Sequence, residues 1–382
     1  MNNPLSKFKN ILTIDFDKNR NYGLDILRAL AIFFVLNVHS AHFFNPNSML
    51  SKVLLKLNLD GVTLFFVLSG FLIGGILIRT FEKEKISFKT LFNFWKRRWF
   101  RTLPNYLLIS FILLLLGTHS KTITGFEQVK SYFYFYANFK EPLPDYFFPE
   151  SWSLSIEEWF YLLIPVFLFI MTAVYWFRPK ASILLVVLGV IAFSTWFRYY
   201  RYSCWPDIVP EQIDANFRKQ VITRLDSLMY GVLGAFCAAY YPEIWKRYKK
   251  TLFITGIALL YIGYLQYITG QWVPIYRLVI YFSIQPIGFL CLIPLVTELK
   301  TGEGFIYRVI TRFSIISYAV YLINYSLIKT YAIGFLDKWL FNNISPEHLA
   351  PINYFSFWFL TIVIAALLYK YFEKPFTALR DL

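Results

Sequence analysis

Ten long runs of this sequence carry almost no charge, and this feature limits the fold more than any other. A helix needs about 20 apolar residues to cross a bilayer. Continuous rather than alternating apolar runs indicate helices, which satisfy their own backbone hydrogen bonds in lipid. We therefore predict an all-α, polytopic membrane bundle of about ten transmembrane helices. The predicted spans are Ile26–Phe44, Gly61–Ile78, Thr102–Gly117, Ser153–Phe177, Ala181–Arg198, Arg224–Tyr241, Thr251–Ile268, Tyr276–Thr297, Phe313–Phe335 and Asn353–Phe372.

Composition agrees with this prediction. Hydrophobic residues make up 57% of the chain and charged residues 16%, whereas soluble domains contain about 45–50% and about 25%. These values exclude a disordered chain, a coiled coil and an ordinary cytosolic enzyme. We divide the chain into an N-terminal tail (residues 1–25), a membrane domain (26–372) and a C-terminal tail (373–382), without a signal peptide or an appended soluble domain.

The lysines and arginines predict the orientation. Of 38 basic residues, 24 lie on the side of the N-terminus and nine on the other side, while five lie within or at the ends of spans. The positive-inside rule then places both termini in the cytoplasm. The net charge of +15 follows from this distribution. Since the basic residues form no soluble basic face, we expect no nucleic-acid partner.

The first span carries ionisable groups, which are costly in a membrane and therefore functional candidates. Arg28 and His39 are eleven positions apart, so they share one helix face and are separated by about 16 Å of rise. Asp25 and His42 flank them as supporting candidates. Arg28 as an interfacial anchor and His39 as a packed polar residue are the alternatives.

A basic segment, residues 79–101, precedes the third span. Its aromatic and leucine residues recur every three or four positions, which predicts an amphipathic helix on the cytoplasmic surface. Arg97, Arg98 and Arg101 form one patch on this helix. The patch is either an anchor for anionic membrane lipids or a clamp for phosphate groups, to which arginine binds with a planar fork.

Two adjacent carboxylates, Glu157 and Glu158, open the fourth span in the motif WSLSIEEWFY. Because neighbouring helical residues face different directions, the two need different partners. Asp60 begins the second span, where Ser69 and Gly70 permit close helix packing. We place both glutamates and Asp60 in the outer half with His39 and His42, opposite the cytoplasmic arginines, which suggests group transfer across the membrane.

These motifs resemble the acyltransferase-3 family of integral membrane acyltransferases. The resemblance rests on LDILRA (24–29) followed by His39, on GVTLFFVLSGF (61–71), on the RxxR of Arg98 and Arg101, and on WSLSIEEWFY (152–161). It implies transfer of an acyl group, commonly acetyl, from cytoplasmic acyl-CoA to a hydroxyl of a surface or lipid-linked glycan in the bacterial inner membrane. Relatives that carry a fused extracytoplasmic domain lead us to expect that this chain acts alone or with a separate extracytoplasmic transferase.

We therefore hypothesise that Arg28, Arg98 and Arg101, with Arg97, hold the phosphates of acyl-CoA, most simply acetyl-CoA. His39 then acts as general base or first acyl acceptor, and Glu157 or Glu158 orients it. We expect no metal, because the sequence contains no His, Cys and carboxylate cluster with ligand spacing.

Two alternatives remain from the sequence. One is a transporter or exporter of a glycan or lipid-linked intermediate, which buried charges also suit. No inverted repeat supports it, and no Walker A motif is present. The other is a non-catalytic scaffold.

Overall fold

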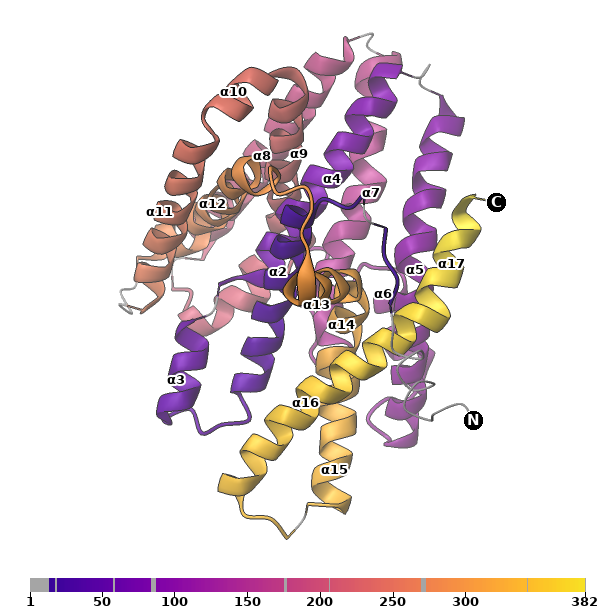
Figure 1. The fold of residues 1–382 in the computed structure, drawn as a ribbon, viewed down its shortest axis with the longest axis vertical. Helices are drawn as coiled ribbons and strands as arrows, with labels where there is room; N and C mark the ends of the chain where they lie inside the picture. The colour runs from indigo at the N-terminus through magenta and orange to yellow at the C-terminus, as the bar shows by residue number, and fades with distance from the viewer. Residues whose placement is uncertain are drawn as a thin grey trace.

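The computed structural model describes residues 14–17, 19–57, 59–83, 87–174, 177–205, 207–268, 273–341 and 343–381. Most of the predicted N-terminal tail and Lys85 of the basic segment lie outside this set. All regular secondary structure in the described residues is helical, as Figure 1 shows. The predicted all-α class is therefore confirmed.

The longer helices are α2 (Tyr22–Ala41), α3 (Met49–Lys56), α4 (Gly61–Lys83), α5 (Phe88–His119), α6 (Phe126–Phe133), α7 (Trp152–Phe169), α8 (Pro179–Cys204), α9 (Val221–Tyr240), α10 (Pro242–Arg247), α11 (Lys249–Ile268), α12 (Tyr281–Val296), α13 (Gly304–Ile315), α14 (Ser317–Ile323), α15 (Gly334–Trp339), α16 (Pro346–Leu368) and α17 (Lys374–Ala378). Short 3-10 or π-helical turns join them: η1 (Pro149–Ser151), η2 (Ile170–Val174), η3 (Pro210–Gln212), η4 (Asp214–Arg218), η5 (Tyr276–Ile280), η6 (Asn324–Ile333), η7 (Tyr369–Glu373) and η8 (Leu379–Asp381).

The ten predicted spans all coincide with helical segments. Within the described part of the chain, nine helical stretches are long and apolar enough to cross a membrane. The remaining predicted span coincides with α11 and is not among those nine. The protein is therefore a multi-pass helical membrane protein.

The first helix begins earlier than predicted, at Tyr22, where the Asn21 side chain accepts a hydrogen bond from the Leu24 amide. Asp25 consequently lies inside α2 and is 1% exposed. A buried carboxylate needs compensation, and Arg20, Arg28 and Ser314 supply it through hydrogen bonds.

The prediction of a separate surface helix before the third span is wrong. Residues 88–119 form one continuous helix, α5, which contains Pro104 and begins at a cap from Ser87. Trp95 lies in the first half of α5 and donates a hydrogen bond to the Tyr161 carbonyl of α7. This contact holds the basic segment against the bundle.

Helix α4 packs most extensively against α9. The predicted close approach at Gly70 is confirmed, because a Cβ added there would lie 1.9 Å from the Leu228 carbonyl oxygen. A Cβ at Gly231 on α9 would lie 2.1 Å from the Val67 carbonyl oxygen. Small residues let two helix backbones touch in this way. In Figure 1, α16 and α17 cross obliquely in front of the other long helices.

Candidate functional site

Two cavities of similar size lie inside the bundle. The first has a volume of about 630 Å³, and we name it the arginine cavity because Arg20, Arg28, Arg98, Arg101 and Arg380 line it. The second, of about 610 Å³, is lined by His39, and we name it the histidine cavity. Helices α2, α4, α7 and α14 contribute to both.

The two cavities have wall residues in common. Val62 of α4 and Tyr321 of α14 line both of them. The Tyr321 hydroxyl is fixed, since it accepts a hydrogen bond from Ser153 and donates one to the Glu150 carbonyl. The cavities are thus neighbours, and these two side chains form part of the wall between them.

Charge distinguishes the two cavities. The arginine cavity is lined by six cationic side chains, its five arginines and Lys374, and by two carboxylates, Glu157 and Glu373. The histidine cavity is lined by three cations and four carboxylates: Arg218, Lys219, Lys329, Asp60, Asp145, Glu150 and Asp214. Because opposite charges attract most strongly away from water, the first cavity suits a polyanion and the second a neutral molecule.

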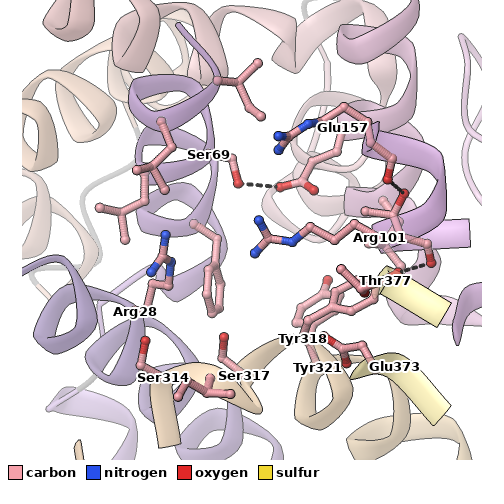
Figure 2. A pocket seen from close by; sticks show the side chains of 18 of the residues that line it. Arg28, Ser69, Arg101, Glu157, Ser314, Ser317, Tyr318, Tyr321, Glu373 and Thr377 are labelled. Atoms are coloured by element: carbon pink, nitrogen blue, oxygen red, sulfur yellow. Dashed lines mark hydrogen bonds between the residues drawn. The ribbon is translucent and has the colours of Figure 1, made fainter. Parts of the chain in front are cut away.

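Arg28 points into the arginine cavity from α2 and faces Arg101 from α5, as Figure 2 shows. Arg28 is 3.3 Å from Asp25, which also binds Arg20 at 2.5 Å. Asp25 thus contacts both of these arginines. A carboxylate in this position restricts the orientation of the guanidinium groups.

The three arginines of the basic segment do not act alike. Arg98 and Arg101 line the arginine cavity, whereas Arg97 is exposed and does not. The Nε of Arg98 is buried and makes no hydrogen bond in the part of the chain that is described. Helical spacing alone does not predict this difference, because Arg97 and Arg98 lie about 40° and about 60° from Arg101 on opposite sides of it.

Glu157 lies in the arginine cavity, not in the outer half with His39 as expected. Its carboxylate accepts hydrogen bonds from Ser69 at 2.9 Å, drawn in Figure 2, and from Tyr161 at 3.2 Å. The reason is the path of the chain. Glu150 lines the histidine cavity, and seven further residues of helix carry Glu157 about 10 Å away.

Glu158 lines neither cavity. It is 8% exposed and accepts a hydrogen bond from the Thr102 hydroxyl at 2.7 Å. The two glutamates therefore face different partners, as their adjacency on a helix predicted. Glu158 joins α7 to α5, and its contacts are those of a structural residue.

His39 lines the histidine cavity near the other end of α2 from Arg28. Its Nδ1 is hydrogen-bonded to Asn324 Oδ1 at 2.5 Å, and its ring packs edge-on against Tyr325 with centroids 4.8 Å apart. Among the described residues, no glutamate contact therefore supports the hypothesis that Glu157 or Glu158 orients His39. His42 lines the same cavity, and its ring bonds to the Val38 carbonyl.

Asp60 caps α4 at the edge of the histidine cavity by accepting hydrogen bonds from the Val62 and Thr63 amides. It also forms an ion pair with Arg218 at 3.2 Å, and Arg218 binds Asp214 at 3.0 Å. Burial by itself lowers the pKa of Arg218, but the two carboxylates outweigh burial and raise that pKa above its usual range. The charges on this wall thus compensate one another.

The sequence interpretation missed three polar residues of this region: Glu150 and Lys329, which line the histidine cavity, and the buried Asn324, which binds His39. Asn324 contacts His39, Glu150 accepts hydrogen bonds from the Ser326 amide and hydroxyl, and the Lys329 ammonium lies 5.1 Å from the centre of the Tyr325 ring. Each is a polar residue within or beside an apolar run. The search for polar groups in apolar runs that selected His39 could therefore have found them. It could not have shown which residues they contact.

Among the described residues, no group of three or more His, Cys, Asp or Glu side chains is arranged to hold a metal ion.

Residues 21–370 match the family model Acyl_transf_3, described as an acyltransferase domain. The chain belongs to this acyltransferase family. The match extends over nearly all of the described structure and includes every residue that lines the histidine cavity and most of those that line the arginine cavity. It confirms the resemblance that the motifs of the first half of the chain suggested.

Curated relatives are similar over part of their length. The peptidoglycan O-acetyltransferase OatA of Listeria monocytogenes (strain EGD-e) is 28% identical over 61% of this chain and 37% of OatA. YrhL of Bacillus subtilis (strain 168), described by its name as a candidate peptidoglycan O-acetyltransferase, is 30% identical over 43% of this chain and 26% of YrhL. The chain thus spans well under half the length of these relatives. No solved structure matches it significantly.

Proposed function

We propose that this protein is an O-acyltransferase that moves an acetyl group from cytoplasmic acetyl-CoA to a hydroxyl of a cell-surface or lipid-linked glycan. The observation that carries this proposal is the pair of neighbouring cavities, one rich in arginine and one lined by His39. Membership in the acyltransferase family supports the reaction type.

The arginine cavity is the proposed binding site for the donor. Coenzyme A carries a diphosphate and a further phosphate, and arginine binds phosphate through paired, charge-assisted hydrogen bonds. Six cations line this cavity against two carboxylates. The excess of lysine and arginine on the N-terminal side of the membrane supports a cytoplasmic opening for it.

The thioester must reach from this cavity toward His39. Arg28 and His39 lie about 16 Å apart along α2, which the extended pantetheine arm can cover. Val62 and Tyr321 line the shared wall that the acyl group would pass. A flexible arm bound by its phosphates at one end would thereby bring its carbonyl carbon to the histidine.

His39 is the proposed catalytic residue. As general base it takes the proton of the acceptor hydroxyl while the hydroxyl oxygen attacks the thioester carbonyl carbon. The C–S bond then breaks, an ester forms, and the proton passes to the sulfur of the leaving coenzyme A. As first acyl acceptor, a ring nitrogen instead attacks the carbonyl carbon, and the C–S bond breaks to release coenzyme A as its thiolate. The hydroxyl oxygen then attacks the acyl carbon, the C–N bond breaks, and the hydroxyl proton neutralises the thiolate.

The histidine cavity is the proposed binding site for the acceptor. Its charges are nearly balanced, and Trp152, Tyr146 and Tyr331 line it. Aromatic faces combined with carboxylates suit the apolar faces and hydroxyls of a sugar ring. The activities named for the relatives make peptidoglycan fragments the first acceptors to test.

The test uses the purified protein in membranes with radiolabelled acetyl-CoA and peptidoglycan fragments. We expect acceptor-dependent release of free coenzyme A and labelled ester. His39→Ala should reduce the rate at least about 10³-fold, because it removes the reacting group. His348→Ala is the matched control, since His348 is exposed, bonds to Ser345 and lines neither cavity.

Undiminished transfer by the His39→Ala protein would remove His39 from the reaction. Glycan transport without coenzyme A release would instead support an exporter. Accumulation of acetyl label on the wild-type protein without an acceptor, absent from His39→Ala, would select the acyl-histidine route over general-base catalysis.

A further inference from the structure

Asn324 is a fully buried amide at the junction of α14 and η6, 285 positions from its partner His39. Its side chain makes three hydrogen bonds. The amide nitrogen Nδ2 lies 2.7 Å from the Tyr321 carbonyl oxygen and 3.2 Å from the Val320 carbonyl oxygen. The amide oxygen Oδ1 lies 2.5 Å from His39 Nδ1.

These contacts fix which way the amide faces. A carbonyl oxygen can only accept, so the two backbone carbonyls require the NH₂ group of Asn324. The reversed amide would place its oxygen against both carbonyl oxygens and would lose both hydrogen bonds at a buried site. Oδ1 is therefore the atom that faces the imidazole.

The orientation of the amide fixes the tautomer of His39 in turn. Because Oδ1 is an acceptor, Nδ1 must carry the proton. A neutral imidazole has one N–H, so the lone pair is then on Nε2. His39 lines the cavity, and its Nε2 makes no hydrogen bond to any residue that the structure describes. The edge-on contact with Tyr325 restricts the plane of the ring.

We propose that Asn324 is a positioning residue that holds His39 with its proton on Nδ1 and the reactive lone pair on Nε2. This inference rests on the proposed function, because it assigns the nitrogen that takes the proton or the acyl group. Nδ1–H stays bonded to Asn324 on either route, so the ring does not turn during transfer.

The partner is a neutral amide, and this affects the base. An adjacent carboxylate would favour the protonated imidazole, which cannot accept a proton, up to a higher pH. Tyr325 on η6 packs against the ring, and the other charged or titratable groups around it are His42 at the C-cap of α2, Arg218 on η4, Glu150 on η1 and Lys329 on η6. None of these four is within hydrogen-bonding distance of His39 in the described structure.

The first test reads the tautomer directly in the full-length protein. The chain has four histidines, so ¹⁵N-histidine NMR in lipid is simple, and loss of one signal pair in His39→Ala assigns His39. We expect a protonated Nδ1 and an unprotonated Nε2 in the wild type. The opposite pattern, or rapid exchange between the two tautomers, would overturn the proposal whatever the enzyme's substrate.

The second test compares Asn324→Leu with Asn324→Asp. The leucine variant removes the acceptor, so its kcat should fall about 10²–10³-fold while the KM for the donor is unchanged. The aspartate variant keeps an acceptor for Nδ1–H and should recover part of the rate. Its acidic limb in the rate–pH profile should lie at higher pH, because a carboxylate favours the protonated imidazole.

Asn353→Leu is the matched control, because Asn353 is also a buried helical amide but bonds to Asp337 and lines neither cavity. We expect it to retain the wild-type rate. Equal losses in both Asn324 variants without a shifted pH limb would mean a purely structural role and overturn the proposal. If His39→Ala is inactive while Asn324→Leu behaves as wild type, only this inference fails; if His39→Ala is active, the proposed function fails first.

Discussion

The arginine cavity and the histidine cavity have nearly the same volume, but the first has an excess of positive charge and the second is nearly neutral. In the first, six cations outnumber two carboxylates. In the second, Arg218 is bound between Asp60 and Asp214, and the charges almost cancel. A buried charge needs a partner. The excess cations therefore indicate an anionic ligand in the arginine cavity. In the histidine cavity the charged side chains pair with one another, and His39 remains available.

Reversing one charge in the arginine cavity is the strongest test of whether its positive charge binds the donor. We expect Arg101→Glu to raise the KM for acetyl-CoA about 10–100-fold, because hydrogen bonds to charged groups contribute about 1.5–3 kcal/mol. The KM for the acceptor should stay the same. Initial rates measured with each substrate varied in turn check this prediction.

Arg97→Glu is the control for that experiment. Arg97 lies on the same helix, four positions earlier, but is exposed and outside the cavity. Its KM for the donor should remain near the wild-type value. If both variants raise the KM for the donor equally, the effect comes from the general surface charge, and the arginine cavity has no special role.

In the histidine cavity, removing a cation should instead affect stability. Arg218→Met leaves Asp60, whose side chain is only 12% exposed, without its ion pair. We expect a loss of about 1–3 kcal/mol in unfolding free energy and an unchanged KM for the donor. Thermal unfolding in detergent measures the loss. Lys219→Met, which removes only a contact to the half-exposed Asp214, should cost less; an equal or larger cost contradicts the internal pairing.

Salt provides a smaller but independent comparison. Raising the ionic strength from about 0.05 to 0.5 M should increase the KM for acetyl-CoA several-fold, because screening weakens attraction between the cations and the phosphates. The KM for a neutral glycan fragment should change little. Similar salt dependence for both substrates would mean that the charge contrast does not control binding.

The smallest expected effect concerns Asp214 at the rim of the histidine cavity. Burial raises the pKa of Asp214, but Arg218 and Lys219 outweigh it and lower that pKa below its ordinary value of 3.8. The ion pairs therefore stabilise the fold above pH 3.8, and this contribution is lost as the pH falls through the lowered pKa.

Since Asp214 is half exposed, we expect Asp214→Asn to lose less than about 1 kcal/mol at pH 7. The difference in melting temperature from the wild type should vanish at the acidic end of a pH series. A difference that grows on acidification would contradict the pairing of Asp214 with these cations.

Much of the fold could be predicted because the bilayer imposes a simple rule on the sequence. Every predicted span coincides with a helical segment, and Gly70 lies at a close helix contact as expected. The helix of the basic segment was also predicted, but not its continuation through Pro104. Periodicity within one segment also does not reveal the contact between Trp95 and α7 that holds this segment against the bundle.

The candidate site was predicted only in part. Helical spacing correctly separated Arg28 from His39 along α2 and turned Glu157 away from Glu158. The depth of Glu157 was misjudged. The chain passes the histidine cavity at Glu150, and seven residues later Glu157 lies in the arginine cavity. Helical geometry relates residues within a segment, but it does not state at which depth the segment begins.

By itself, the sequence determined the class of fold, the positions of the spans and which polar or charged residues lie in them at an energetic cost. These follow from local physics: hydrocarbon rejects charge, and a helix satisfies its own backbone. Only the tertiary structure decided which polar groups meet, such as His39 with Asn324 and Asp25 with Ser314. Those pairs join distant helices, and their contacts depend on how the helices pack in three dimensions.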